Sequence, residues 1–259
     1  MNIIGIIPAR MASSRFPGKP LVNINGIPMI GHVYHRSKMC HKLSDVYVAT
    51  CDQEISDYVK SIGGQVIMTA STHDRASDRT AEAVPKIENQ SGKQIDIVVM
   101  LQGDEPMITP EMIESGIEPM IQDSRIHVAN LMGKIDDTNE FENSNEVKVV
   151  INQENYALYF SREPIPSRKK YSGSIPMWKQ LGLIVFRKEA LLAYSKMEPT
   201  PLEIIESVDM NRLIENGNPI KMVSTSYETI GVDTELELQT VETKLQNDPL
   251  AKSYLSFRE

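Results

Sequence analysis

The fold of this chain is restricted above all by short apolar runs that alternate with helical segments. Residues 3–7 form a β-branched run that stops at Pro8, a pattern typical of a buried strand in a parallel sheet. The same reasoning predicts strands at 46–50, 65–69 and 95–101, and helices at 28–39, 54–62 and 76–89. Strands and helices that alternate in this way predict an α/β fold, with a Rossmann-like, mostly parallel sheet covered by helices on both faces.

The pattern changes after Asn145, where two predicted strands, 147–152 and 156–161, are separated only by a polar turn. A polar stretch with several Pro, Arg and Lys residues follows and closes near an apolar run at 181–186. We expect residues 145–186 to form an inserted β-rich subdomain within a single domain that spans residues 1–259. Beyond the insert, helices are predicted at 200–216 and 234–246, with a strand at 220–224 between them.

The composition disfavours several classes of protein. The net charge is −8, from 27 basic and 35 acidic residues, which disfavours a general nucleic-acid-binding surface. Two cysteines, Cys40 and Cys51, are too few to organise 259 residues through disulfides and fit a reducing compartment. The apolar N-terminal run is too short to span a bilayer, and no other segment reaches that length. We therefore expect a cytoplasmic protein without a membrane or nucleic-acid partner.

Residues 8–20 form a polar loop directly after the first predicted strand. Ligands bind beyond the carboxyl ends of the strands in open parallel sheets, so this loop is well placed for a binding site. It carries Arg10, Arg15 and Lys19, which could bind the phosphates of a nucleotide, and small residues whose backbone N–H groups could approach an anion. The alternative is a solvated surface loop with scattered charges. The spacing does not match the Walker A motif.

Acidic residues follow the strand at 95–101 and precede the last helix. Gln102-Gly103-Asp104-Glu105-Pro106 comes directly after the strand, where carboxylates are well placed to hold a divalent metal. Gly103 before two acids favours close approach of a ligand, although an acidic turn that merely ends the strand is the alternative. Asp233 could serve only as a helix N-cap, or it could converge with Asp104 on one Mg²⁺.

These segments together resemble one family. The run Ile-Pro-Ala-Arg-Met-Ala-Ser-Ser-Arg-Phe-Pro-Gly-Lys-Pro-Leu at 7–21 is similar to the CTP-binding motif of the 3-deoxy-manno-octulosonate (Kdo) cytidylyltransferases, also called CMP-Kdo synthetases. Further matches stand in the family's order and cover nearly the whole chain, at residues 47–50, 101–106, 147–150, 156–162, 201–203 and 231–234. The first motif is shared with sialate-type cytidylyltransferases, whereas Tyr-Ala-Leu-Tyr-Phe-Ser-Arg at 156–162 is more specific to the Kdo branch.

The resemblance implies a fold of the nucleotide-diphospho-sugar transferase type and a Mg²⁺-dependent reaction, in which the anomeric hydroxyl of the sugar attacks the α-phosphate of CTP and pyrophosphate leaves. It implies a homodimer formed through the β-rich insert, and a role in lipopolysaccharide or cell-surface polysaccharide synthesis. The implied CTP-binding residues are Pro8, Ala9, Arg10, Ser13, Ser14, Lys19, Arg79 and Gln102. The implied catalytic residues are Arg10, Arg15, Lys19 and Asp104, and the implied Mg²⁺ ligands are Asp104 and Asp233. The implied acceptor-binding positions are Arg162, Gln180, Ile184, Glu206, Asp209 and Met210.

The chain departs from the family mainly where the sugar is expected to bind. Gln180 and Ile184 stand in place of a histidine and a tyrosine, and Asp209-Met210 in place of a Glu-Gln pair. Ile204 also replaces a histidine, and Arg75-Ala76-Ser77 replaces Ser-Gly-Thr. A site that loses hydrogen-bonding groups loses discrimination between acceptors, so an altered acceptor is one hypothesis and compensated drift is the other.

The sequence leaves three candidate functions open. The leading one is transfer of CMP to Kdo or a Kdo-like sugar. The second is a nucleotidyltransferase of the same fold with a different acidic acceptor, such as an amino-substituted Kdo, another ulosonic acid or a phosphonate. The third is a nucleotide-binding homologue without activity, against which the joint presence of Arg10, Arg15, Lys19, Asp104 and Asp233 argues.

Overall fold

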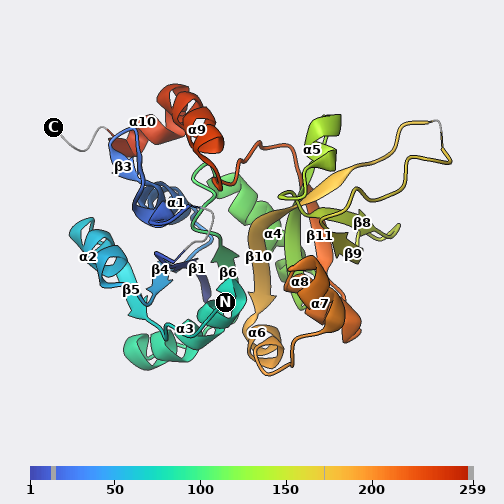
Figure 1. Ribbon diagram of the computed structural model, residues 1–259. Helices are drawn as coiled ribbons and strands as arrows, with labels where there is room; N and C mark the ends of the chain where they lie inside the picture. The colour runs from blue at the N-terminus through green and yellow to red at the C-terminus, as the bar shows by residue number, and fades with distance from the viewer. Residues whose placement is uncertain (13–15, 172, 256–259) are drawn as a thin grey trace. The chain divides into compact units, whose positions relative to one another are not determined.

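A computed structural model describes residues 1–12, 16–171 and 173–255 of the chain (Figure 1). The chain divides into two compact units, of which the first comprises Met1–Glu114 and Glu228–Glu259 and the second comprises Ser115–Tyr227. The first unit is therefore built from two separate stretches of sequence. As a result it contains the Asp104 loop and Asp233, which lie far apart along the chain.

The first unit is built on a parallel sheet with the strand order β6-β1-β4-β5. Its strands are β1 (Ile3–Ala9), β4 (Asp45–Thr50), β5 (Gln65–Met68) and β6 (Ile97–Leu101). Every residue of β1 is buried, because this strand pairs on both sides and packs against helices α1 and α3. Ile6 pairs with Tyr47 and with Met100, so the carboxyl ends of β1, β4 and β6 reach the same edge of the sheet.

Helices and a small hairpin complete the first unit. They are the 3-10 helix η1 (Lys19–Leu21), β2 (Asn23–Ile24), β3 (Ile27–Pro28), α1 (Met29–Lys38), α2 (Gln53–Ser61), α3 (Ala76–Ser91), α9 (Glu235–Asn247) and α10 (Pro249–Leu255). Helix α10 packs against α1. Val232 and Val241 join an apolar cluster with Ile24 and Ile27 of the hairpin. This cluster fixes the backbone next to Asp233 in the core.

The second unit combines parallel and antiparallel strands. They are β7 (Val128–Lys134), β8 (Lys148–Ile151), β9 (Ala157–Ser161), β10 (Trp178–Arg187) and β11 (Lys221–Thr225). Strand β7 pairs in parallel with β11 and antiparallel with β10, and β8 pairs antiparallel with β9 and β10. The unit also holds α5 (Thr138–Glu142), α6 (Lys188–Tyr194), α7 (Pro201–Glu206) and α8 (Met210–Glu215). Helix α4 (Pro110–Gln122) crosses the boundary between the two units in sequence.

The expected α/β fold with a mostly parallel sheet is confirmed, and the predicted strands and helices of the first unit are present. The predicted β-rich region, 145–186, contains β8, β9 and most of β10. Helix α4 and strand β7 were not predicted. Gly116 and Pro119 interrupt the helical pattern in the sequence of α4. The glycine at position 116 has a packing reason, because a Cβ there would lie only 2.8 Å from Leu183 Cδ2. Among the helices in the described ranges, none has the length and apolar character needed to cross a membrane.

The prediction of a single helix over 200–216 is wrong. Helix α7 ends at Glu206 and α8 begins at Met210, because Ser207 has φ 53° and ψ 44°, the left-handed conformation that ends an α-helix. Glu203 and Arg212 form a buried ion pair across this turn, with Arg212 Nη2 2.6 Å from Glu203 Oε1 and Nε 2.7 Å from Oε2. The break therefore allows α7 and α8 to pack together through the ion pair between Glu203 and Arg212.

Candidate active site

Three charged side chains from distant parts of the chain meet in the first unit. The Nζ of Lys19 lies 2.7 Å from Oδ2 of Asp104 and 2.8 Å from Oδ1 of Asp233. Lys19 begins η1, Asp104 lies in the loop after β6, and Asp233 directly precedes Thr234, the N-cap of α9. The two carboxylates thus face a single cationic centre.

Backbone contacts hold these residues in position. The N–H of Val232 donates to the carbonyl oxygen of Asp104 at 2.9 Å, which links the two acidic segments directly. The N–H of Asp233 donates to Glu237 Oε2 at 2.7 Å, next to the capping box that Thr234 and Glu237 form at the start of α9. Because Thr234 is the N-cap, the carboxylate of Asp233 does not serve in that role and is directed to Lys19.

The pKa of Lys19 reflects this double pairing. Burial is the largest influence and acts to lower the pKa of Lys19, but Coulombic attraction and hydrogen bonds from Asp104 and Asp233 outweigh it and raise the pKa above its usual value. The ammonium group therefore stays charged between the two carboxylates.

The same pair of carboxylates suits a divalent metal. Mg²⁺ is commonly held by one or two protein carboxylates, with waters and substrate phosphates as its other ligands. Among the described residues there is no cluster of three or more His, Cys, Asp or Glu side chains that could hold a metal. Asp104 and Asp233 therefore fit a metal that takes its other ligands from water and phosphate.

Gly103 lets the Asp104 loop approach the end of β1. A Cβ at this position would lie 3.2 Å from Ile30 Cδ1 and 3.3 Å from the carbonyl oxygen of Pro8, which is tighter than ordinary van der Waals contact. The group that lies close to Gly103 is thus the backbone of Pro8, whereas the sequence led us to expect a ligand there.

A basic pocket of about 140 Å³ opens where β1 ends and the loop into α3 begins. Its lining residues are Pro8, Ala9, Arg10, His73, Asp74, Arg75, Ala76 and Arg79. Three arginines against one aspartate give the pocket a positive charge, which suits a phosphate-bearing ligand. Four of the expected CTP-binding residues line it, whereas Gln102 lies in the turn after β6, where its carbonyl accepts from the N–H of Glu105 at 3.3 Å.

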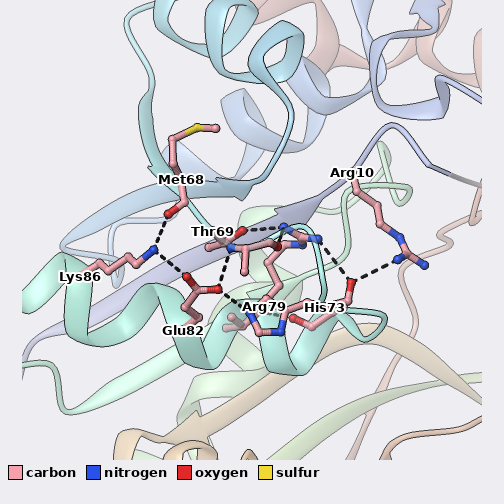
Figure 2. A network of polar contacts seen from close by, with 10 residues as sticks. Arg10, Met68, Thr69, His73, Arg79, Glu82 and Lys86 are labelled. Carbon is pink, nitrogen blue, oxygen red and sulfur yellow. Dashed lines mark hydrogen bonds and ion pairs between the residues drawn. The ribbon is translucent and has the colours of Figure 1, made fainter.

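Arg79 holds the wall of this pocket (Figure 2). Its side chain is buried, and it donates to Thr69 Oγ1 at 2.5 Å, to the carbonyl of Ala70 at 3.3 Å and to the carbonyl of His73 at 3.4 Å. Arg10 Nη1 donates to the same His73 carbonyl at 3.2 Å. The guanidinium expected to read the base is therefore engaged with the loop that shapes the pocket.

Glu82 and Lys86 continue this support along α3 (Figure 2). The Glu82 carboxylate accepts from the N–H of Ala70 at 2.9 Å and from Lys86 Nζ at 2.6 Å, and it contacts the imidazole of His73. Burial acts to raise the pKa of Glu82, but these hydrogen bonds and the Lys86 charge lower that pKa to about 2. Sequence reasoning missed both residues. The spacing of Arg79, Glu82 and Lys86, which places polar groups on one helix face, was an available signal.

The loop that carries the expected phosphate-binding residues is fixed at its two flanks. The N–H of Met11 donates to Asp52 Oδ2 at 2.8 Å, and the N–H of Gly18 donates to the carbonyl of Met11 at 3.2 Å. Gly18 has φ 74°, which a residue with a side chain adopts only with strain. Ser13, Ser14 and Arg15 lie outside the described residues.

Two of the expected acceptor-binding residues, Arg162 and Glu206, lie together in the second unit. The Glu206 carboxylate accepts from Tyr159 Oη at 2.7 Å, from Ser161 Oγ at 2.9 Å and from the N–H of Arg162 at 2.8 Å. The Arg162 guanidinium donates to the carbonyls of Glu206 at 2.8 Å and Ser144 at 2.9 Å. Burial and the neighbouring Glu206 carboxylate raise the pKa of Tyr159 to about 12. Both residues thus brace the chain between β9 and α7.

The other expected acceptor residues have different surroundings. Gln180 Nε2 donates to Asn130 Oδ1 at 2.7 Å across the β7–β10 pair. Ile184 and Met210 are buried, with 1% and 0% of their surface exposed, and Asp209 is the N-cap of α8. Ile184 and Met210, which replace polar residues of the family, therefore pack in the interior of the second unit, whereas Ile204, which also replaces a polar residue, is 63% exposed.

A parallel sheet with a basic pocket and paired carboxylates at its carboxyl edge defines a nucleotide-binding α/β protein. The family model described as Cytidylyltransferase matches residues 4–226. The chain therefore belongs to the cytidylyltransferase family, and its resemblance to the 3-deoxy-manno-octulosonate cytidylyltransferases is confirmed by the relatives that follow.

The 3-deoxy-manno-octulosonate cytidylyltransferase of Geobacter metallireducens is 44% identical, over 95% of this chain and 98% of the relative. That of Geobacter sulfurreducens is 42% identical, over 95% of this chain and 100% of the relative. The solved structure of CMP:2-keto-3-deoxy-manno-octonic acid synthetase in complex with CTP superposes with a TM-score of 0.87 at 37% identity, covering 95% of this chain and 99% of that chain. The likeness thus extends over nearly the full length of this chain and of each of these proteins.

Proposed function

We propose that this protein transfers CMP from CTP to the anomeric hydroxyl of 3-deoxy-manno-octulosonate and releases pyrophosphate. Its place would be the cytoplasm, where the product supplies lipopolysaccharide or other cell-surface polysaccharide synthesis. The observation that carries the proposal is the meeting of Lys19, Asp104 and Asp233 at the sheet edge that also forms the basic pocket. Relatives named for this reaction match nearly the whole chain, which supports the choice of base and acceptor.

CTP binding is assigned to the first unit. Pro8, Ala9, Arg10 and Arg79 line the pocket, and we place the cytidine part of CTP there. Gln102, which follows β6, is proposed to contact the cytosine together with Arg79. The triphosphate would be held by Lys19 and by Arg10, together with Ser13, Ser14 and Arg15 of the same loop.

The reaction is a displacement at the α-phosphorus. The anomeric oxygen of the sugar forms a bond to this phosphorus and loses its proton, while the bond to the oxygen that bridges to the β-phosphate breaks and pyrophosphate leaves with the electron pair. Arg10 and Lys19 would stabilise the negative charge that grows on the leaving group. Asp104 and Asp233 would hold Mg²⁺, which supplies charge neutralisation and alignment of the phosphates when bound.

We assign the acceptor to the second unit. The Glu206 carboxylate and the Arg162 guanidinium fix the segment around residues 159–162, which carries the motif most specific to the Kdo branch. Their part in acceptor binding is therefore to shape this segment. Gln180, Ile184, Asp209 and Met210 are proposed to tune acceptor choice, Ile184 and Met210 through the packing beneath the site.

A pyrophosphate-release assay tests the proposal. The purified protein would be given each of the four NTPs with Kdo, an amino-substituted Kdo, another ulosonic acid and a phosphonate. We expect release with CTP and Kdo, and little release with other bases. Release with CTP only in the presence of another acid would assign a different acceptor. CTP binding without release from any pairing would indicate a protein that binds nucleotide but does not catalyse transfer.

We also propose that the protein is a homodimer that associates through the β-rich region 145–186. Leu158 on β9 and Tyr171 in the following loop are 56% and 65% exposed, so apolar side chains on this region are available to a partner. Light scattering coupled to size exclusion tests this. A dimer mass that falls to a monomer mass in a Leu158→Glu variant is the expected result, and a monomer mass for the unmodified protein would contradict it.

A further inference from the structure

The ammonium group of Lys19 contacts both carboxylates that are proposed to hold a divalent metal, those of Asp104 and Asp233. Its Nζ is 2.7 Å from one carboxylate oxygen and 2.8 Å from the other. A Mg²⁺ ion bound to the same two oxygens needs distances of about 2.0–2.1 Å. A metal held by Asp104 and Asp233 would therefore compete with the ammonium group of Lys19 for the same carboxylate oxygens.

We infer that Lys19 is an internal counter-ion that a divalent metal must displace from Asp104 and Asp233. The inference rests on the proposed metal-dependent transfer and concerns the order of events within it. Lys19 leaves the carboxylates when the phosphates of the nucleotide offer its ammonium group another anionic partner. Metal binding and triphosphate binding are then coupled through one side chain.

Burial and charge support this role. The Lys19 side chain is 11% exposed, whereas the Asp104 and Asp233 side chains are 26% and 21% exposed, so the carboxylates remain reachable from solvent. Two carboxylates that face each other without a cation repel, and the contacts of 2.7 and 2.8 Å from Lys19 Nζ show that its ammonium group supplies that cation in this structure. An incoming cation must therefore compete with an interaction that is already favourable.

The backbone around the cluster favours exchange of the cation over movement of the carboxylates. The Asp104 carbonyl is held by the N–H of Val232, and the N–H of Asp233 is held by Glu237. Val232 is fully buried in the apolar cluster that includes α9. Lys19, by contrast, reaches the acids through a long, flexible side chain, so its head can move while the two acids stay in place.

The test measures metal binding without nucleotide. Mn²⁺ would be titrated into the full-length protein and free Mn²⁺ followed by electron paramagnetic resonance, for the unmodified protein and for Lys19→Met. We expect the variant to bind Mn²⁺ about tenfold more tightly, because the competing ammonium group is gone and both carboxylates remain. The matched control is Lys38→Met, which removes an ammonium group from an exposed ion pair with Asp45 and should leave Mn²⁺ binding unchanged.

Thermal unfolding provides a second readout that does not depend on activity. Added MgCl₂ should raise the Tm of Lys19→Met more than that of the unmodified protein, because a ligand that binds only the folded state stabilises it by linkage. The gain in Mn²⁺ affinity should disappear in the double variant Lys19→Met/Asp104→Asn. Equal or weaker Mn²⁺ binding by Lys19→Met, including undetectable binding to both proteins, would overturn the inference. Failure of the proposed function would instead appear as absence of pyrophosphate release by the unmodified protein.

Discussion

Arg10 at the end of β1 and Arg79 on α3 donate hydrogen bonds to the same acceptor, the carbonyl oxygen of His73, at 3.2 and 3.4 Å. One backbone atom thus links the end of β1, where the proposed phosphate-binding loop begins, to helix α3, which carries Arg79 of the pocket lining. This atom belongs to the loop from Thr69 to His73. Arg79 and Glu82 of α3 hold that loop through hydrogen bonds to Thr69 Oγ1 and to the N–H of Ala70. Glu82, which does not line the pocket, can therefore affect its shape through this loop.

Replacement of Glu82 by Gln should weaken CTP binding without a comparable effect on turnover. One oxygen of the carboxylate becomes an amide NH₂, which cannot accept a hydrogen bond. Replacement of Oε2 removes the acceptor of the Ala70 N–H and the partner of the His73 imidazole, and replacement of Oε1 removes the acceptor of Lys86, so the pocket wall loosens. We expect KM for CTP to rise about fivefold, with kcat within about twofold of the unmodified protein. Steady-state pyrophosphate release measures both constants.

The control for Glu82→Gln is Glu54→Gln, which removes an exposed carboxylate from the first turn of α2. It should leave both constants unchanged. A loss of kcat with constant KM in Glu82→Gln would place this residue in the chemical step and would contradict a positioning role.

Replacement of Asp104 by Asn should abolish turnover while the fold is retained. The amide carries no negative charge, so the pair that faces Lys19 and would hold the metal is reduced to one carboxylate. We expect kcat to fall at least about a thousandfold, with far-UV circular dichroism unchanged. Activity close to that of the unmodified protein would remove Asp104 from the proposed metal site.

His32 should make the protein less stable in mild acid. Its ring is fully buried, with Nδ1 2.8 Å from Tyr254 Oη and Nε2 2.8 Å from the carbonyl of Ile24, contacts that the neutral imidazole satisfies. Burial, with a smaller effect of Arg36, lowers the pKa of His32 to about 4, against 6.5 as its usual value. Between these values the unfolded chain binds a proton at this position and the folded protein does not, so stability falls as pH decreases from 6.5 to 4.

The expected loss of unfolding free energy from His32 over this range is roughly 3 kcal/mol. Urea unfolding at pH 7 and pH 4.5 measures it. His32→Gln should flatten this part of the profile, whereas His127→Gln, which changes an exposed histidine, should not. A His32→Gln profile as steep as that of the unmodified protein would show that other groups cause the acid sensitivity.

Ser207 should tolerate glycine better than alanine. Its φ of 53° is left-handed, a conformation that strains any residue with a Cβ, and both substitutions remove the same hydroxyl. We expect Ser207→Gly to exceed Ser207→Ala in unfolding free energy by about 1 kcal/mol. Chemical denaturation of the two variants provides the comparison, and equal stabilities would mean that the turn relaxes at this position.

Local patterns predicted the elements of the first unit well because they need no distant information. The run at residues 3–7 is continuous and β-branched, and β1 there is fully buried. The error at residues 200–216 has a different origin. The apolar spacing continues across Ser207, but the chain turns back there, and this turn brings Glu203 and Arg212 together as a buried ion pair.

The sequence predicted which kinds of residue the candidate site contains, but it did not predict how their side chains are arranged. Basic residues in a loop after one strand and acids after another predict a phosphate and metal site, because parallel strands end at one edge of a sheet. The sequence could not show that the ammonium group of Lys19 lies between Asp104 and Asp233. It also could not show that Arg79 donates hydrogen bonds to Thr69 and to the carbonyl of His73.

The sequence by itself thus determined the α/β fold, the family and the residue types available for nucleotide chemistry, since short-range periodicity and motif order carry that information. Only the tertiary structure decided which partners these side chains take. Lys19 and Asp233 lie together in a unit where α9 packs against the hairpin that follows η1. Contacts between residues so far apart in the chain depend on packing, which no local pattern records.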